Sequence, residues 1–178
     1  EIYVDEEVKA YQAGGGLIYD TTARQEENKY NRIEVPRGSE YWIVLPDGTR
    51  VWLNAATELK YPVAFHAKER RVYLKGEAYF EVAPDKNRPF YVETEEVKIR
   101  VLGTVFDVKA YPRYSPDVIL YQGRVNVSHT KRNQSKEMHP GEQISLDKQG
   151  KLQLKRVDTE KRKGWAENEF SFDNTDLR

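Results

Sequence analysis

Acidic residues are the side chains of this sequence that come closest to a catalytic arrangement. Glu77 and Glu81 lie four residues apart in the run GEAYFEV. On one strand they would face the same side about 13 Å apart, whereas a carboxylate pair that hydrolyses a glycoside needs roughly 5 to 9.5 Å. Asp47, Asp85 and Asp107 could converge only from other strands, which spacing alone does not reveal. We therefore expect Glu77 and Glu81 to be outer-face residues of a half-buried strand, and a hydrolase with convergent carboxylates is the third of three functional hypotheses.

Other reactive groups are scarce. The chain has no Cys, which excludes disulfides, thiolate zinc sites and cysteine nucleophiles. Its histidines, His66, His129 and His139, are not at metal-ligand spacing. No nucleophile elbow, HExxH motif, phosphate loop or dinucleotide fingerprint occurs. The sequence therefore predicts no catalytic residue, no metal site and no cofactor.

Aromatic residues offer a second kind of chemistry. They make up 12% of the chain, with 12 Tyr and 3 Trp. Exposed rings on a β-sandwich can stack on sugars, so a carbohydrate-binding module is the second hypothesis. Tyr and Trp are also good strand formers that pack across strands. A sugar binder should present two or three coplanar rings on a concave face, and a hydrolase two carboxylates within about 10 Å in a cleft, one with a perturbed pKa.

Charge and hydropathy exclude further classes. The chain carries 29 Lys and Arg against 29 Asp and Glu, without the basic excess of a nucleic-acid binder. No apolar run reaches the length of a transmembrane helix, and the first residues lack the basic-then-apolar pattern of a signal sequence. Because the chain starts EIYVDEE and has Met138 as its sole methionine, we expect it to be a piece of a longer protein.

The elements that would position these side chains are strands. From residue 31, short runs rich in Val, Ile, Tyr and Phe alternate with turn signals about every 8 to 12 residues, the spacing of an all-β sandwich or barrel. Val97, Ile99 and Val101, for example, alternate with Lys98 and Arg100. We predict an all-β domain of about twelve short strands in two packed sheets, a sandwich or a β-roll. A small β-helix-like wrap is the alternative.

Glycines and one acid mark the turns. In PDGT, Pro46 sets φ, Asp47 can bond its own backbone and Gly48 accepts a positive φ. We therefore interpret Asp47 as the turn residue of a hairpin between EYWIVL and RVWLN, not as a catalytic acid. Gly76 and Gly103 interrupt strand patterns, as glycines do at a bulge or a close backbone approach, and Gly141 lies in the turn signal PGE.

The two ends differ from this body. Residues 1–30 are polar and are predicted to be a leading arm with one strand, LIYD, after a Gly triplet. Residues 158–178 are charged and then aromatic, and they end NTDLR, which resembles a helix start. We expect a linker there that leads into a second module.

Six segments together resemble the FecR family of periplasmic signalling domains. They are NRIEVPRGSEYWIVLPDGTRVWLNAATELKYP, RRVYLKGEAYFEV, NRPFYVET, VKIRVLGTVFDVKAY, GRVNVS and PGEQ. They follow the family's order over residues 31–157. Asp107 stands where Asn is common in the family and Thr57 where Ser is frequent, and both are small polar changes.

The resemblance implies the periplasmic sensor domain of a membrane-spanning anti-sigma factor with no enzymatic activity. Its expected partners are the N-terminal signalling domain of a TonB-dependent outer-membrane transporter and, through a cytoplasmic segment, an extracytoplasmic-function sigma factor. The segment GWAENEFSFDNTDL resembles the start of the family's small C-terminal α/β domain. Its residues Trp165, Phe170 and Phe172 are the expected partner-binding residues, and membrane anchoring is expected through a single helix outside this chain.

Overall fold

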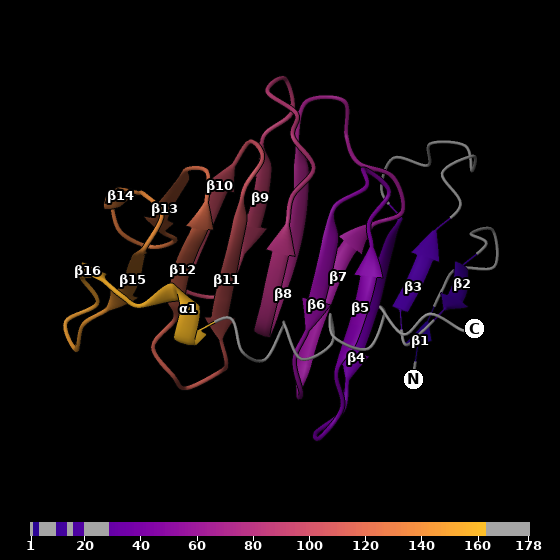
Figure 1. The fold of residues 1–178 in the computed structure, drawn as a ribbon, viewed down its shortest axis with the longest axis horizontal. Coiled ribbons are helices and arrows are strands. Elements are labelled where there is room, and N and C mark those ends of the chain that lie inside the picture. Colours follow the sequence, from indigo (N-terminus) through magenta and orange to yellow (C-terminus); the bar gives the residue numbers. More distant parts are fainter. Residues whose placement is uncertain (1, 4–9, 14–15, 20–28, 163–178) are drawn as a thin grey trace.

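The computed structural model describes residues 2–3, 10–13, 16–19 and 29–162, and these form two β-sheets and one short helix (Figure 1). The prediction of an all-β fold is confirmed. Of the 16 strands, 13 follow residue 29, which agrees with the expected number of about twelve. The helix, α1 (Thr159–Arg162), contacts β12 and follows the last strand.

Sheet A is mostly antiparallel, and β8 contributes its first half to it. In spatial order it contains β1 (Ile2–Tyr3), β4 (Tyr30–Val35), β7 (Thr57–Pro62), β8 (Arg70–Glu81), β9 (Phe90–Glu93), β10 (Val97–Val101), β13 (Val125–His129) and β14 (Ser135–Met138).

Sheet B takes the second half of β8, between β6 and β11. In spatial order it contains β2 (Ala10–Ala13), β3 (Gly16–Tyr19), β5 (Tyr41–Val44), β6 (Arg50–Leu53), β8, β11 (Val105–Ala110), β12 (Asp117–Gln122), β15 (Glu142–Leu146) and β16 (Leu152–Arg156). The segment expected to form a strand near LIYD corresponds to β3, which pairs in parallel with β5.

The change of sheet within β8 occurs at Gly76. Residues 73–75 pair with β7 in sheet A, and residues 78–81 pair with β6 in sheet B. Gly76 has φ +115°, and a Cβ there would lie 2.4 Å from Oγ1 of Thr57 and 2.7 Å from its Cα. Only glycine fits both the backbone conformation and the close approach. This residue therefore allows one strand to serve two sheets.

The core lies between the inner faces of the two sheets. Residues in alternate positions of each strand are buried there, as Val97, Ile99 and Val101 are on β10. Phe80 of sheet B stacks on Phe106 at 5.1 Å between ring centroids and meets Phe90 of sheet A edge-on at 6.2 Å. This continuous apolar layer joins the inner faces of the two sheets.

Candidate functional site

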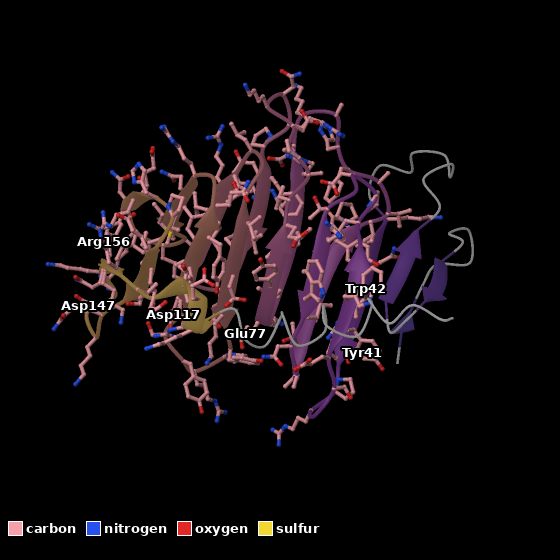
Figure 2. All side chains as sticks on the ribbon, viewed as in Figure 1. Tyr41, Trp42, Glu77, Asp117, Asp147 and Arg156 are labelled. Carbon is pink, nitrogen blue, oxygen red and sulfur yellow. The ribbon has the colours of Figure 1, made fainter. Side chains whose placement is uncertain are left out.

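The outer face of sheet B carries a row of side chains that are paired directly across seven strands. We call it the central rung, and it consists of Trp42, Trp52, Tyr79, Asp107, Ile119, Gln143 and Lys155. Figure 2 labels Trp42 on β5, Glu77 near the centre and Asp117 near α1. Because strands alternate their side chains, the neighbours of these residues along each strand point into the core.

The middle of the central rung is buried although it lies on an outer face. Trp52, Tyr79, Asp107 and Ile119 are each 5% exposed, and Gln143 is 3% exposed. Trp52 and Tyr79 pack edge-to-face at 5.7 Å, and Trp42, Val105 and Tyr121 pack against them. Trp52 and Tyr79 thus form a second, smaller hydrophobic cluster outside the main core.

Two carboxyl groups lie beside these rings. Burial raises the pKa of Asp107 well above its usual range, and the charge of Glu77 and a hydrogen bond with it add to the effect. The Glu77 carboxylate also accepts a hydrogen bond from Nδ2 of Asn54 at 3.0 Å. Oδ1 of Asp107 is buried and has no hydrogen-bond partner among the described residues. Burial together with the Asp107 charge also raises the pKa of the Tyr121 hydroxyl.

This pair fulfils part of the expectation for a hydrolase, because two carboxyl groups lie close together and one pKa is perturbed. A cleft of about 770 Å³ lies among the loops that include Glu95, Tyr114 and Arg132, and neither member of the pair lines it. Glu77 and Glu81 do lie on the outer face of β8, where Glu81 pairs with Arg50 at 3.0 Å.

The sugar-binding hypothesis required coplanar rings. The Trp52 and Tyr79 rings are inclined by 73°, and the Tyr79 and Tyr121 rings by 52°. Trp52 and Tyr79 are also buried. These rings therefore do not form the flat, open platform on which a sugar stacks.

Asp47 lies in the turn between β5 and β6, where Gly48 has φ +87°. Its carboxylate accepts hydrogen bonds from the backbone N–H of Thr49 at 3.0 Å and from the Thr49 hydroxyl at 2.7 Å. It also accepts one from Nη1 of Arg70 at 2.9 Å. Asp47 is therefore both a turn residue and the counter-ion of an arginine.

Arg70 is completely buried at the start of β8. Besides Asp47, its guanidinium donates to the backbone carbonyls of Ala83 at 2.6 Å, Arg88 at 2.9 Å and Leu102 at 3.2 Å. The sequence argument missed this ion pair. Arg70 lies two and four residues before Val72 and Leu74, which face the core. In a strand these three side chains point to the same side, so the alternation could have predicted that Arg70 is buried.

The remaining acids and turn glycines occupy separate places. Asp85 lies near Arg70 and bonds Arg88, so Asp47, Asp85 and Asp107 do not converge on one site. Gly103 approaches Pro84, whose Cα would lie 2.8 Å from an added Cβ, and Gly141 lies in the turn between β14 and β15.

Neither a metal site nor the expected partner-binding residues can be located within the described structure. Residues 29–162 and the three short N-terminal strands contain no group of three or more His, Cys, Asp and Glu side chains placed to hold a metal ion. Trp165, Phe170 and Phe172 lie outside the described residues.

Comparisons with known proteins agree with this architecture. The FecR protein family matches residues 31–126. Two crystal structures of a proposed anti-sigma factor from Parabacteroides distasonis ATCC 8503 are similar, with 35% and 36% identity and TM-scores of 0.73 and 0.72. The alignments cover 78% and 76% of this chain, which spans 65% and 64% of those chains. No curated protein matches the sequence significantly.

The family match extends over more than half of the chain. It includes the β5–β6 turn with Asp47, the two-sheet strand β8 with Arg70 and Gly76, and strand β11 with Asp107. The chain belongs to the FecR family.

Proposed function

We propose that this chain is the periplasmic sensor part of an anti-sigma factor of the FecR type. The observation that carries the proposal is the family match over residues 31–126, together with the fold shared with a proposed anti-sigma factor. The part is regulatory and catalyses no reaction in this proposal. In this proposal a helix outside this chain anchors the protein in the membrane. Among the described residues, no helix is long and apolar enough to cross a membrane.

In this proposal the domain receives a signal from the N-terminal periplasmic domain of a TonB-dependent outer-membrane transporter. It passes the signal to an extracytoplasmic-function sigma factor through a cytoplasmic segment. Residues 31–157 are the sensor domain, residues 1–30 connect it toward the membrane, and residues 158–178 lead into a C-terminal module that contributes to docking.

Edge strands suit such a contact because they present unpaired backbone groups to which a partner strand can add. In the described residues, β16 pairs with β15 on one side and ends sheet B on the other. Leu154 on this strand is 39% exposed, whereas Leu152 is buried. The β16 edge thus offers both backbone groups and an apolar side chain to a partner.

A pull-down tests the transporter contact. The purified N-terminal domain of the transporter encoded beside this protein should be retained by the chain of 178 residues. The variant Trp165→Ala, Phe170→Ala, Phe172→Ala should retain less of it if the start of the C-terminal module contributes to docking. Undiminished retention by this variant contradicts the docking region, and no retention by either chain contradicts the transporter relay.

The carboxyl pair provides the observation that favours a second candidate, a hydrolase. The experiment that separates the two functions is an assay of glycoside hydrolysis with the purified chain. A purely regulatory chain should release no product. Hydrolysis by the wild type that Glu77→Gln abolishes would contradict the purely regulatory interpretation.

A further inference from the structure

Loops from both sheets surround the cleft of about 770 Å³. The β9–β10 and β13–β14 loops come from sheet A, and the β11–β12 and β15–β16 loops come from sheet B. In Figure 2 the label of Asp147 marks the β15–β16 loop, well apart from Trp42 and Glu77. The volume lies in the usual range of ligand pockets, about 300 to 1,000 Å³. We propose that this cleft binds an acidic peptide segment of a partner protein, with an apolar side chain between its acidic residues.

Hydrogen bonds between the loops hold the cleft in shape. The hydroxyl and the backbone N–H of Thr130 donate to two carbonyls of the β9–β10 loop, each at 2.9 Å. Nη1 of Arg132 donates to the carbonyl of Gln149 at 2.5 Å and joins the β13–β14 loop to the β15–β16 loop. The hydroxyl of Ser115 on the β11–β12 loop donates to the carbonyl of Leu146 at 2.7 Å. A peptide thus meets loops that are already in place, which lowers the cost of binding.

The cleft has an excess of positive charge toward a ligand. The charged side chains that line it are Arg113, Lys131, Arg132 and Lys148 on one side of the balance and Glu95, Glu96 and Asp147 on the other. The carboxylate of Asp147 is already bonded within its own turn, by the backbone N–H groups of Gln149 and Lys151 and by Nε2 of Gln153. Four cations therefore face the two remaining carboxylates, and this excess attracts a ligand that carries carboxylates.

The other side chains of the cleft favour a peptide over a uniformly charged polyanion. Glu95 and Glu96 repel a ligand that is negative along its whole length, but they can accept hydrogen bonds from peptide N–H groups. Nδ1 of His129 accepts a hydrogen bond from the backbone N–H of Lys131 at 3.0 Å, so the neutral ring carries its proton on Nε2 and can donate. The Tyr114 side chain is 75% exposed and offers a ring to an apolar side chain.

Arg113 has an unusual backbone conformation in the lining of the cleft. Its φ is +70°, a region that residues other than glycine rarely adopt. The turn that imposes this conformation is closed by the backbone N–H of Tyr114, which donates to the carbonyl of Tyr111 at 3.2 Å. Backbone strain of this kind is concentrated at functional sites. The turn places a cation and an exposed ring next to each other in the cleft.

This binding site goes beyond the proposed signalling function. It uses neither the C-terminal aromatic residues nor the edge of β16, so its partner need not be the transporter. Charge recognition mainly governs the rate of association and makes it depend on salt. Binding of an acidic peptide should therefore weaken as the salt concentration rises.

Fluorescence anisotropy with labelled peptides tests the site in the chain of 178 residues. The probe is the peptide EEWEE, and the peptide KKWKK has the opposite charge. At low salt the chain should bind EEWEE and leave KKWKK unbound. The variant Lys131→Glu, Lys148→Glu should weaken the binding of EEWEE about tenfold or more, because two attractions become repulsions.

Matched variants separate the cleft from the charge of the whole chain. Arg37→Glu, Lys86→Glu reverses two exposed cations on the β4–β5 and β8–β9 loops, and it should change the affinity for EEWEE by less than about twofold. Tyr114→Ala should weaken the binding of EEWEE about threefold and leave the binding of EEGEE unchanged, because EEGEE has no ring to pack. Urea unfolding shows that each variant is folded.

Each other result overturns the proposal. Equal weakening by the two charge variants means that the net charge of the chain, and not the cleft, attracts the probe. Equal affinity for EEWEE and KKWKK means that charge does not select the ligand, and no binding of EEWEE at low salt means that the cleft is not a peptide site. A sulfated oligosaccharide that displaces EEWEE and binds more tightly assigns the cleft to a sugar. Neither transporter nor sigma factor is present, so the result does not depend on the proposed signalling function.

Discussion

Two buried polar side chains, one in the core on the sheet A half of β8 and one on the outer face of sheet B, show how differently the fold can use such groups. In the core, Arg70 is completely buried and its guanidinium bonds Asp47 and several backbone carbonyls. On the outer side, Asp107 is almost as deeply buried, yet one of its oxygens has no partner among the described residues and its other neighbour is a second acid.

The difference distinguishes a buried charge with complete hydrogen bonds from a buried carboxyl group whose hydrogen bonds are incomplete. A buried charge with complete partners holds a fold in one arrangement, whereas a buried polar group without them requires an explanation. The Asp47–Arg70 pair fixes the β5–β6 turn against the start of β8. In the Asp107 region the described residues leave a buried carboxyl oxygen without a partner, and mutations should affect the two regions in opposite directions.

The largest effect should come from Asp47→Ala. This change leaves the buried Arg70 guanidinium without its counter-ion, which typically costs about 3 to 5 kcal/mol of stability. Urea unfolding followed by Trp fluorescence measures the loss. It exceeds the roughly 0.5 to 1.5 kcal/mol expected from one turn hydrogen bond, so the two interpretations of Asp47 can be distinguished.

Asp147 provides the matched control for this experiment. It lies in the turn between β15 and β16 and accepts hydrogen bonds from the backbone N–H groups of Gln149 and Lys151 at 2.8 and 2.9 Å, as Asp47 does from Thr49. No buried arginine contacts it in the described structure. Equal losses for Asp47→Ala and Asp147→Ala would mean that the Arg70 pair contributes nothing.

Asp107→Asn should act in the opposite direction and stabilise the protein at neutral pH. The amide cannot ionise and can donate a hydrogen bond to Glu77, so folding no longer has to suppress the ionisation of a buried carboxyl group, which recovers roughly 1 to 3 kcal/mol. The same urea unfolding experiment measures the gain. Asn is also the residue expected at this position from the family pattern. A loss of stability would show that the ionised carboxylate of Asp107 has a favourable partner.

The stability difference between these two proteins should depend on pH. Because the pKa of Asp107 is raised in the folded state, the unfolded chain releases a proton that the folded chain keeps. Above the ordinary Asp pKa of about 3.9, the wild type therefore loses stability as the pH rises, up to the raised folded-state pKa. The advantage of Asp107→Asn should shrink as the pH falls from 7 to about 4. A constant difference would contradict the raised pKa.

The smallest effect should come from Glu81→Gln at the rim of the outer face. The Arg50–Glu81 pair is 3.0 Å long, but the arginine side chain is 54% exposed. Such a pair contributes about 0.2 to 1 kcal/mol and less at high salt. Unfolding in low and in high salt measures this contribution. If Glu81→Gln lost as much unfolding free energy as Asp47→Ala, the greater solvent exposure of the Arg50–Glu81 pair would not explain why it contributes less than the buried Asp47–Arg70 pair.

Most of the fold was predictable because its physical causes are local. The period-two alternation along runs such as Val97–Val101 predicts strands whose inner faces form one core, and the sequence around Pro46 and Gly48 predicts a turn at the observed place. The two-sheet role of β8 was not predictable, because Gly76 reveals a close approach only once Thr57 is known to lie beside it.

The candidate site was less predictable for a related reason. The pairing of Asp107 with Glu77 depends on the register between β8 and β11, and a single sequence does not specify register. The presence of Asp instead of Asn at position 107 looked like a minor departure, yet it places an ionisable group in a buried rung. Conversely, Arg70 resembles one of many surface charges unless one considers that it points to the same side of β8 as Val72 and Leu74.

The shared strand β8 also constrains how the chain can fold. Its first half requires β7 and β9, and its second half requires β6 and β11, so its neighbours come from residues 50 to 110. Neither layer can be completed while the chain ends before β11, and pairings between distant segments form slowly. During synthesis, β8 should thus keep an unpaired edge until residue 110 has emerged, and this interval is when the protein is most exposed to aggregation.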